Sequence, residues 1–405
     1  MRARILVLTS TFPRWRGDRE PGFVMALCAR LTDEFDVHVL APHAPGTARA
    51  EVIDGVAVTR YRYALARWEH LAYNGGILAN LKRRPVLYLL VPLLLAAQIG
   101  AAVRLLRHRR YDLIHAHWLL PQGLAAALAT RLARRPVPIL CTAHGGDWFA
   151  LRGRLARALK GWTLRRVDTL TVVSHTMADE ARRSPVCSGR IELVPMGTDL
   201  EHLFTPPVAE RPEGADLLFV GRLVEKKGLE HLVRALPEVL RTQPRATLTV
   251  VGAGPEEGRV RDLATQIGVI GRIRFLGSMA HHELPELYRQ AALFVAPFVV
   301  AAGGDQEGFG LVLVEALGCE CPVIASDLPA IRDIVLPDGT GMLVPPGNPQ
   351  ALAAAIITLL GDPERRRRLA RAGRRHVFAR YGWDASAAGY RQILRDRIAA
   401  RHPPA

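Results

Sequence analysis

Residues 215–251 read ADLLFVGRLVEKKGLEHLVRALPEVLRTQPRATLTVV, and the prediction of the fold starts from this stretch. A strand-like apolar run at 215–220 is followed by a helical pattern at 228–241 and by a second strand-like run at 246–251. A strand, a crossover helix and a second strand form a βαβ unit, in which the two strands are parallel. The sequence therefore predicts an α/β domain around a parallel sheet.

The same alternation runs through most of the chain and is interrupted once. Further strands are expected at 4–10, 36–41, 56–61, 112–117, 137–143, 169–173, 190–194, 272–276, 293–296, 322–325 and 341–344. A stretch with clustered prolines, at 199–213, divides the two series. We therefore predict two Rossmann-like, doubly wound α/β domains facing each other across a cleft, with residues 1–203 in the first and 204–382 in the second.

The charge of the chain favours an anionic partner. The 405 residues include 54 Lys and Arg against 38 Asp and Glu, a formal net charge of +16 at pH 7. Such a surface suits a membrane face, a phosphate-bearing substrate or a polynucleotide. Aromatic residues make up only 6%, and no ladder of basic and aromatic residues that could stack bases is present, so we expect no nucleic-acid partner.

The cysteines indicate a reducing compartment. There are five of them, without a C-x-x-C pair, so neither a disulfide framework nor a zinc site is expected. The apolar run at residues 5–8 is too short for a signal peptide and soon meets Pro13. We predict a cytoplasmic protein.

One apolar stretch, VLYLLVPLLLAAQIGAAV at 86–103, departs from the strand–helix rhythm. Basic residues flank it, with Arg83 and Arg84 before it and Arg104 after it. Three readings are open: a buried helix with a loop, a helix lying in the headgroup plane of an anionic membrane, or a spanning helix. Spanning is the least favoured, because it would divide the first domain between its strands. In the membrane-surface reading the protein is peripheral, and the three arginines contact lipid.

Residues 305–316, DQEGFGLVLVEA, carry the clearest chemical pattern. Glu307 is expected in a loop and Glu315 in a helix that begins near Phe309, so that helical rise would separate the carboxylates by about 12 Å. That span matches a sugar, a diphosphate and a ribose in a row, since carboxylates accept hydrogen bonds from vicinal hydroxyls. Gly308 and Gly310 would let the backbone amides of a helix start approach an anion. The alternative is an ordinary helix start with Glu315 exposed to solvent.

The turn after the strand at 215–220 reads GRLVEKKG and holds two of the four lysines of the chain. It lies at the carboxyl end of a strand, where open α/β sheets bind ligands. Arg222 and Lys227 are the candidates to neutralise the charge that grows on a leaving diphosphate. The alternative is a solvated basic turn.

GRLVEKKG followed by EGFGLVLVEALG resembles retaining glycosyltransferase family 4 (glycosyl transferases group 1), which carries a Glu-x(7)-Glu motif on a GT-B fold. DLIHAHW, ILCTAHGGDWF, LVPMGTDLEHLF and CPVIASDLPAIRDIV resemble further segments of that family in the same order. The resemblance covers roughly residues 4 to 396. It implies the GT-B fold, with the last helix, 383–405, packed back on the first domain.

The resemblance also implies a role for each candidate residue. Glu307 would contact hydroxyls of the donor sugar and Glu315 the ribose, while Arg222 and Lys227 would hold the diphosphate. The amides of Gly308, Phe309 and Gly310 would add to that grip. His144 would line the catalytic centre, and Gly22 would let donor and acceptor come close.

Three positions need a separate comment. The first-domain loop reads Asp-Arg-Glu-Pro-Gly at 18–22, where the family usually has a Gly-Gly pair, and this points to a different acceptor mode. His144 has the alternative of capping a turn. His115 and His117 share one face of a strand but lack a third ligand nearby, so no metal site is expected.

The functional prediction is a hexosyltransferase that uses a nucleoside-diphosphate sugar and a glycan or lipid-linked acceptor, in cell-envelope or exopolysaccharide synthesis. No Asp-x-Asp pair is present, so we expect no metal and no other cofactor. Configuration would be retained, as the resemblance implies. The alternatives are a nucleotide-sugar epimerase-like enzyme, a nicotinamide-dependent oxidoreductase suggested by the lone G-x-G at 252–254, and a non-enzymatic basic protein of the membrane surface.

Overall fold

The structure is a computed structural model, and it describes residues 2–18, 20, 22–73, 76–151, 153–208 and 214–401. The chain divides into two compact units. Unit 1 comprises Met1–Met196 and Ser386–Ala405, and unit 2 comprises Gly197–Ala385. Arg19 and Pro21 of the first-domain loop, part of the proline stretch at 209–213 and the end of the chain at 402–405 lie outside the described residues.

Unit 1 is built on an eight-stranded sheet in the order β3-β4-β2-β1-β5-β6-β7-β8. All neighbouring strands are parallel except β3 and β4, which are antiparallel. The strands are β1 (Arg4–Leu8), β2 (Asp36–Pro42), β3 (Ala50–Ile53), β4 (Val56–Tyr61), β5 (Leu113–His117), β6 (Ile139–Ala143), β7 (Thr169–Val172) and β8 (Arg190–Leu193). The helices are α1 (Phe23–Leu31), α2 (Ile77–Arg83), α3 (Leu90–His108), α4 (Leu124–Ala133), α5 (Arg154–Leu164) and α6 (His175–Arg183).

Unit 2 has a six-stranded parallel sheet in the order β11-β10-β9-β12-β13-β14. Its strands are β9 (Asp216–Val220), β10 (Thr247–Val251), β11 (Ile273–Gly277), β12 (Leu293–Ala296), β13 (Val323–Ser326) and β14 (Met342–Val344). Its helices are α7 (Leu229–Thr242), α8 (Glu257–Gln266), α9 (Leu284–Gln290), α10 (Leu311–Gly318), α11 (Pro349–Gly361) and α12 (Pro363–Tyr381). In chain order these strands run 3-2-1-4-5-6, the order of the Rossmann fold, which confirms the predicted fold class.

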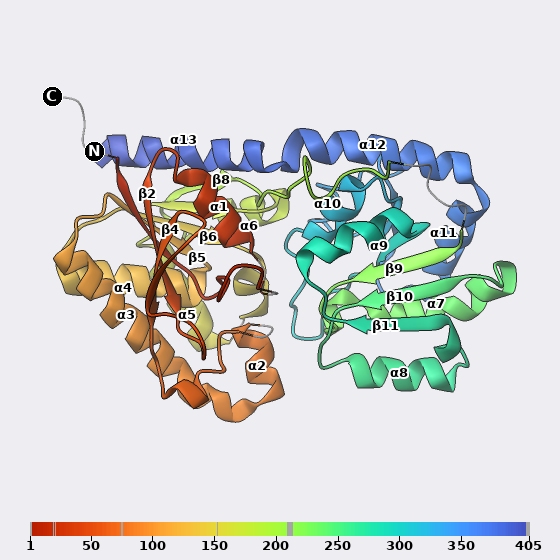
Figure 1. Cartoon of the computed structure of the whole chain (residues 1–405), viewed down its shortest axis with the longest axis horizontal. Helices are drawn as coiled ribbons and strands as arrows, with labels where there is room; N and C mark the ends of the chain where they lie inside the picture. Colours follow the sequence, from red (N-terminus) through yellow and green to blue (C-terminus); the bar gives the residue numbers. More distant parts are fainter. Residues whose placement is uncertain are drawn as a thin grey trace. The chain divides into compact units, whose positions relative to one another are not determined.

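Helices cover both faces of the sheet in unit 2 (Figure 1). One core joins alternate residues of β9, β10 and β12 to the apolar stripes of α7, α8 and α11. Phe294 in β12 points to the opposite face, because side chains alternate along a strand, and there its ring meets Tyr288 of α9 at 5.4 Å. The parallel strands are therefore buried on both sides and read as apolar runs in the sequence.

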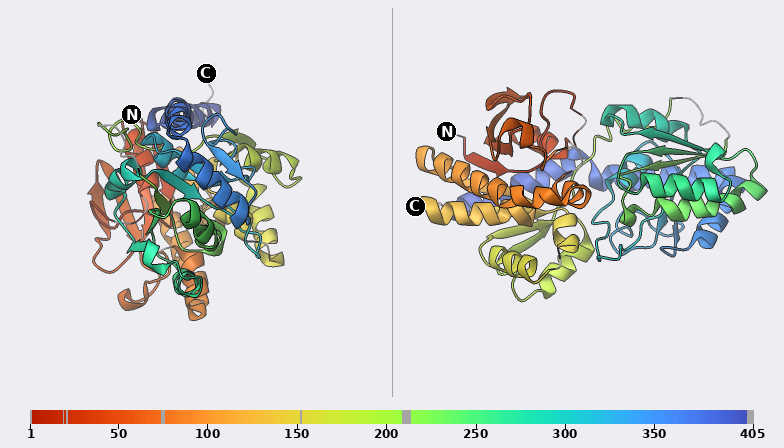
Figure 2. Two further views of the ribbon diagram at one scale, coloured as in Figure 1. Left: turned by 90° about the vertical axis from the view of Figure 1, so that its right-hand side faces the viewer. Right: turned by 90° about the horizontal axis from the view of Figure 1, so that it is seen from below.

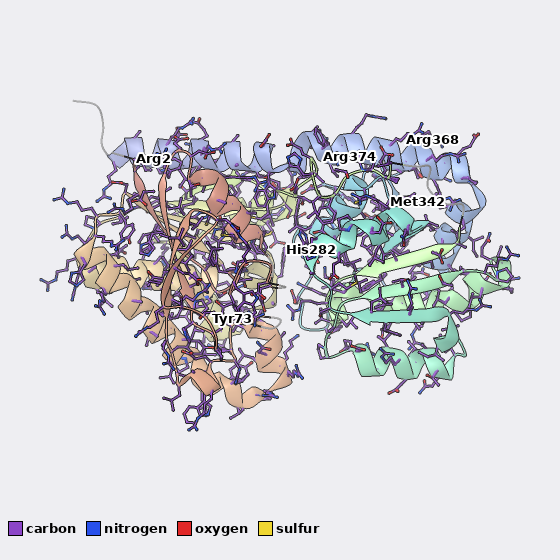
Figure 3. All side chains as sticks on the ribbon, in the orientation of Figure 1. Arg2, Tyr73, His282, Met342, Arg368 and Arg374 are labelled. Carbon is purple, nitrogen blue, oxygen red and sulfur yellow. The ribbon has the colours of Figure 1, made fainter. Side chains whose placement is uncertain are left out.

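The limits of the two units differ by a few residues from the expected domain limits. Unit 2 begins at Gly197 rather than at residue 204, because the segment after Gly197 packs within unit 2. Arg374 of α12, labelled in Figure 3, donates hydrogen bonds to the carbonyl oxygens of Leu200 and Phe204. The last helix, α13 (Trp383–Arg401), begins in unit 2, and its residues from Ser386 onward belong to unit 1.

The apolar stretch of unit 1 is helical almost without a break. A 3₁₀ helix, η2 (Pro85–Leu89), leads into α3, which lies beside α4 (Figure 2). Pro92 stands in the first turn of α3, where a proline costs little, and so does not interrupt the helix. The run Pro85–His108 is long and apolar enough to cross a membrane, and only 17% of its apolar window is buried. The reading as a buried helix is therefore wrong for most of this stretch.

Candidate active site

The strand order of unit 2 points to one place for a ligand. From β9 the chain adds β10 and β11 toward one edge of the sheet, and it then returns to add β12, β13 and β14 on the other side of β9. The parallel neighbours β9 and β12 therefore mark the topological switch point. Ligands of open α/β sheets bind outside the carboxyl ends of the strands at such a switch point. The segments that follow these two strands are the turn with Arg222 and Lys227 and the loop with Glu307.

Lys227 and Glu307 meet in an ion pair at this switch point. Lys227 Nζ lies 2.7 Å from Glu307 Oε2, and each side chain is only 14% exposed. The other carboxylate oxygen, Oε1, accepts hydrogen bonds from the backbone amides of Gly308 at 3.2 Å and Phe309 at 3.5 Å. Burial favours the neutral acid, but Lys227, Lys226 and these hydrogen bonds outweigh it and lower the pKa of Glu307 to about 2. Glu307 is therefore an ionised carboxylate that can only accept hydrogen bonds near neutral pH.

A second ion pair, which the sequence reasoning missed, ties the two segments together. Lys226 Nζ lies 3.0 Å from Asp305 Oδ1 and 3.2 Å from the carbonyl oxygen of Gln306. On the same turn the carboxylate of Glu225 accepts a hydrogen bond from the amide of Ala302. The amide of Val299 donates to the carbonyl of Lys226. These contacts hold the loop that carries Glu307 against the turn that carries Lys227. The two adjacent lysines at 226–227 are the sequence feature from which these contacts could have been predicted.

Close backbone packing explains the glycines of this region. Gly228 has a φ of +65°, and a Cβ there would lie 1.8 Å from the carbonyl oxygen of Pro297. A Cβ at Gly252 or Gly254 would lie 1.9 or 2.2 Å from carbonyl oxygens of the turn after β9. The two glycines of the G-x-G at 252–254 therefore allow two backbone turns to pack closely. This contact explains the glycines, and a dinucleotide-binding role is not needed. The side chain of Arg222, on that turn, is exposed.

Glu315 is held from two sides within α10. It is 7% exposed, so the alternative in which it faces solvent is wrong. His281 Nε2 lies 2.9 Å from Oε1, and the Tyr288 hydroxyl donates to Oε2 at 3.0 Å. Burial disfavours the imidazolium, but the hydrogen bond and charge of Glu315 raise the pKa of His281 overall. Neither His281 nor Tyr288 was a sequence candidate, although His281 opens the HHEL segment just before α9.

The helical segment between the two carboxylates is shorter than expected. α10 begins at Leu311, because Gly310 has a φ of +96° and ends the preceding loop in a left-handed conformation. Glu307 is therefore outside the helix, and the estimate of about 12 Å from helical rise over eight residues does not apply. The loop, and not the helix, sets the position of Glu307.

His144 and Gly22 belong to unit 1. His144 follows β6 and is partly exposed, and its ring lies 5.2 Å from Phe23 and 4.8 Å from Trp118 between centroids. Gly22 directly precedes Phe23 at the start of α1, and a Cβ built there meets nothing within 4 Å. No protein atom described therefore requires glycine at that position.

The neighbours of His144 are also histidines. His144 Nε2 lies 3.1 Å from His117 Nδ1, and burial lowers the pKa of His144 to about 3. His144 is therefore neutral at physiological pH. Within the described residues there is no group of three or more His, Cys, Asp or Glu side chains that could hold a metal ion.

The candidates thus form two groups. Lys227, Glu307, Gly308 and Phe309 are in direct contact in unit 2, on the same segments as Arg222 and Gly310, while Glu315 lies further along α10. Gly22 and His144 are close neighbours in unit 1 through Phe23. Arg83, Arg84 and Arg104 are all exposed around η2 and α3.

Comparison with known proteins identifies the family. The family model described as Glycosyltransferase Family 4 matches residues 23–202, and that of Glycosyl transferases group 1 matches residues 205–376. The chain is 32% identical over 313 residues to a glycogen synthase of Mycobacterium tuberculosis, and the match covers 73% of each protein. The chain belongs to glycosyltransferase family 4.

Two further relatives span almost the whole of this glycosyltransferase. A GDP-mannose-dependent alpha-(1-6)-phosphatidylinositol monomannoside mannosyltransferase of M. tuberculosis is 28% identical, over 98% of this chain and 100% of its own. The solved structure of sucrose-phosphate synthase from Thermosynechococcus elongatus superposes with a TM-score of 0.78 at 26% identity, over 98% and 100% of the two chains. The fold is GT-B, as expected. The family assignment therefore favours a glycosyltransferase over the epimerase-like enzyme, the oxidoreductase and the non-enzymatic protein.

Proposed function

We propose that this glycosyltransferase moves a hexose-type sugar from a nucleoside-diphosphate sugar to a glycan or lipid-linked acceptor, with retention of anomeric configuration and without a metal ion. The observation that carries the proposal is the Lys227–Glu307 pair at the switch point of unit 2. It places a cation for phosphate beside a permanent carboxylate for sugar hydroxyls, which is the chemistry that a nucleotide-sugar donor needs.

Each residue at the switch point has a distinct part in binding the donor. Glu307 accepts hydrogen bonds from hydroxyls of the donor sugar, and Lys227 with Arg222 neutralises the diphosphate. Without a donor, the amides of Gly308 and Phe309 donate hydrogen bonds to the carboxylate of Glu307. When the donor is bound, these two amides and that of Gly310 turn toward its negatively charged phosphate instead. Glu315, oriented by His281 and Tyr288, accepts hydrogen bonds from the ribose hydroxyls.

The proposed chemistry relies on positioning and charge. The acceptor hydroxyl attacks the anomeric carbon on the face from which the diphosphate leaves, and a phosphate oxygen takes its proton. Lys227 and Arg222 stabilise the charge that develops on the leaving group, so no side chain is needed as a base. His144 contacts the transferred sugar, and Gly22 leaves room for the acceptor.

The relatives support a nucleotide-sugar donor but differ in their substrates. Their names give glycogen, a phosphatidylinositol mannoside and sucrose phosphate as products or acceptors. A lipid-linked acceptor in envelope or exopolysaccharide synthesis fits both the phosphatidylinositol relative and the exposed apolar helix of unit 1.

A donor panel tests the proposal. UDP-, GDP- and ADP-sugars are screened for thermal stabilisation of the protein and then for release of the nucleoside diphosphate, with and without EDTA. We expect one donor to be hydrolysed slowly, EDTA to have no effect, and NMR to show that the first sugar anomer released has the configuration of the donor. Glu307→Ala should abolish release, and Lys227→Ala should reduce it on the order of 100-fold. Absence of binding and release with every donor would contradict the proposal. Inversion of the anomeric configuration would contradict retention, and sensitivity to EDTA would contradict a reaction without a metal ion.

We also propose that η2 and α3 rest on the cytoplasmic face of an anionic membrane. Leu89 is 74% exposed and Leu93 51% exposed, so apolar side chains of this helix face solvent. Lys82, Arg83 and Arg84 are exposed at its start and Arg104, Arg107, Arg109 and Arg110 at its end. An apolar face with cations at both ends suits the boundary between anionic headgroups and acyl chains.

Vesicle sedimentation tests the membrane proposal. Each basic side chain near an anionic surface contributes about 1 kcal/mol, so Arg83→Ala with Arg84→Ala should weaken binding to phosphatidylserine vesicles roughly 30-fold. The matched control removes two exposed arginines of unit 2, Arg234→Ala with Arg272→Ala, and should change little. Equal losses in the two pairs would indicate that net charge alone attracts the vesicles.

A further inference from the structure

A row of buried polar side chains crosses one face of the sheet of unit 1. His115 and His117 of β5 share this face with Thr142 of β6 and Thr171 of β7, which are in register as neighbours across the parallel strands. All four are fully buried, and Tyr390 of α13 packs over them, its ring 5.4 Å from that of His115. Thr142 Oγ1 lies 2.8 Å from His115 Nε2 and 2.6 Å from Thr171 Oγ1. A polar row in the core has to place each proton against an acceptor.

The ring nitrogens without partners show where those protons lie. Among the described residues, His115 Nδ1 and His117 Nε2 are buried with no hydrogen-bond partner. An unpaired buried N–H is costly and rare, whereas a bare acceptor lone pair is more readily tolerated. Each of these two nitrogens therefore carries its lone pair, and the proton of each ring is on the other nitrogen. His115 then donates from Nε2 to Thr142, and His117 carries its proton on Nδ1.

Burial ensures that each ring has only one proton to place. It lowers the pKa of His115 to about 3, and it lowers the pKa of His117 well below its ordinary value. His144 is neutral for the same reason. The three histidines are thus neutral imidazoles, and each of them has one nitrogen that can donate a hydrogen bond and one that can accept.

We infer that His117 fixes the tautomer of His144, so that His144 presents Nδ1–H as a hydrogen-bond donor. His117 Nδ1 donates to His144 Nε2 across 3.1 Å, which makes Nε2 an acceptor and leaves the proton of His144 on Nδ1. The two rings are nearly parallel, at 14°, and the backbone amide of His144 donates to Asp147, so the ring is held in place.

This inference rests on the proposed function and makes it more specific. Within the described part of the chain, Nδ1 of His144 makes no hydrogen bond and the residue is partly exposed, so this atom is open to a ligand. An N–H group at Nδ1 needs a hydrogen-bond acceptor on the ligand, which an oxygen atom of the sugar or the phosphate provides. His117 is then a positioning residue, because it acts only through His144.

The direct test measures the tautomer without any substrate. In protein labelled with ¹⁵N-histidine, the chemical shifts of the two ring nitrogens report which of them carries the proton. His144 is assigned from the signal lost in His144→Asn. We expect the Nδ1–H tautomer for His144 and for His117, and the Nε2–H tautomer for His115. An Nε2–H tautomer at His144 would overturn the inference, whether or not a donor sugar is ever found.

A pair of variants separates positioning from packing. The amide of His117→Asn can place an N–H near the position of Nδ1, whereas the amide of His117→Gln reaches the position of Nε2. We expect His117→Asn to keep the Nδ1–H tautomer of His144 and near-normal kcat. His117→Gln should shift the tautomer and lower kcat/KM roughly 2- to 10-fold, the value of one hydrogen bond between neutral groups. Thermal unfolding checks that both variants fold. Equal losses in two folded variants with an unchanged tautomer would show that His117 only fills space.

Discussion

At the scale of single residues, the environment of Glu307 sets what this carboxylate can do. Two lysines and two backbone amides surround it, so it stays charged although burial favours the neutral acid. The sequence could indicate Glu307, Lys227 and the two amides, because they lie in short motifs with a known chemistry. It could not indicate His281, Tyr288 or His117, since their partners are remote in the chain and only packing brings them together.

The ionisation of Glu307 predicts a pH-dependent contribution to stability. Its pKa is lowered from 4.5 to about 2, so the charged form stabilises the fold fully above about pH 4.5 and this stabilisation is lost as the pH falls toward 2. Glu307→Gln should therefore be less stable than the wild type at pH 7, and the difference in the free energy of unfolding should shrink at pH 3. Urea titrations at both pH values measure it, with the half-exposed Glu201→Gln as control. A difference that grows on acidification would contradict the assignment.

At the scale of elements, the turn after β9 and the loop after β12 behave as one structure. Lys226 and Asp305 join them through side chains that are 19% and 22% exposed, well shielded from solvent. Both elements come from the carboxyl ends of adjacent strands, so the sheet brings them together before any side chain contributes. Loss of this ion pair should therefore affect the position of Glu307 rather than the fold.

A double-mutant cycle tests the joint between the turn and the loop. We expect Lys226→Met and Asp305→Asn each to lower kcat/KM, because each frees the loop that carries Glu307. The double variant should lose less than the sum of the two, with a coupling energy of about 0.5–3 kcal/mol. Effects that simply add would show that the two side chains act independently. Midpoints of thermal unfolding should change little in all three variants.

The strands were more predictable from the sequence than the helices of unit 1. The expected runs at 56–61 and 293–296 coincide with β4 and β12. β12 is buried on both faces and reads as a continuous apolar run, whereas β4 alternates between buried and partly buried residues. The edge strand β3 was missed, since only one of its four residues is buried and the strand lacks a continuous apolar run. α4 was not predicted individually either. It is rich in alanine and buried on most of its surface, so no polar face marks its helical period.

At the scale of the whole molecule, the C-terminal helix α13 contributes side chains to the core of unit 1, which is otherwise built from the N-terminal half of the chain. Tyr390 of α13 is fully buried in unit 1, where its hydroxyl lies 3.3 Å from Thr142 Oγ1. Arg395, on the same helix, pairs with Glu34 at 2.5 Å. The division into two α/β domains followed from the alternating pattern, but the residues at which the units divide depend on packing that the alternation does not encode.

The position of Tyr390 predicts a selective loss of stability. Tyr390→Ala removes a large buried ring and should destabilise unit 1 by about 3–5 kcal/mol. Hydrogen exchange followed by mass spectrometry should then rise in peptides from β5 and β6 and remain unchanged in peptides from β9 and β10. The surface variant Arg371→Ala is the control. Equal acceleration in both sheets would mean that the two units unfold as one.

The tight backbone contacts of Gly228, Gly252 and Gly254 limit how this enzyme can be engineered. Any side chain at these positions would collide with a carbonyl oxygen of a neighbouring turn. A library designed to change donor preference should therefore keep all three glycines and Arg222, and diversify exposed positions beside the glycines, such as Ala253 and Pro255. Variants that accept a new nucleotide base should emerge from those positions, while substitutions of the glycines should be recovered as insoluble protein.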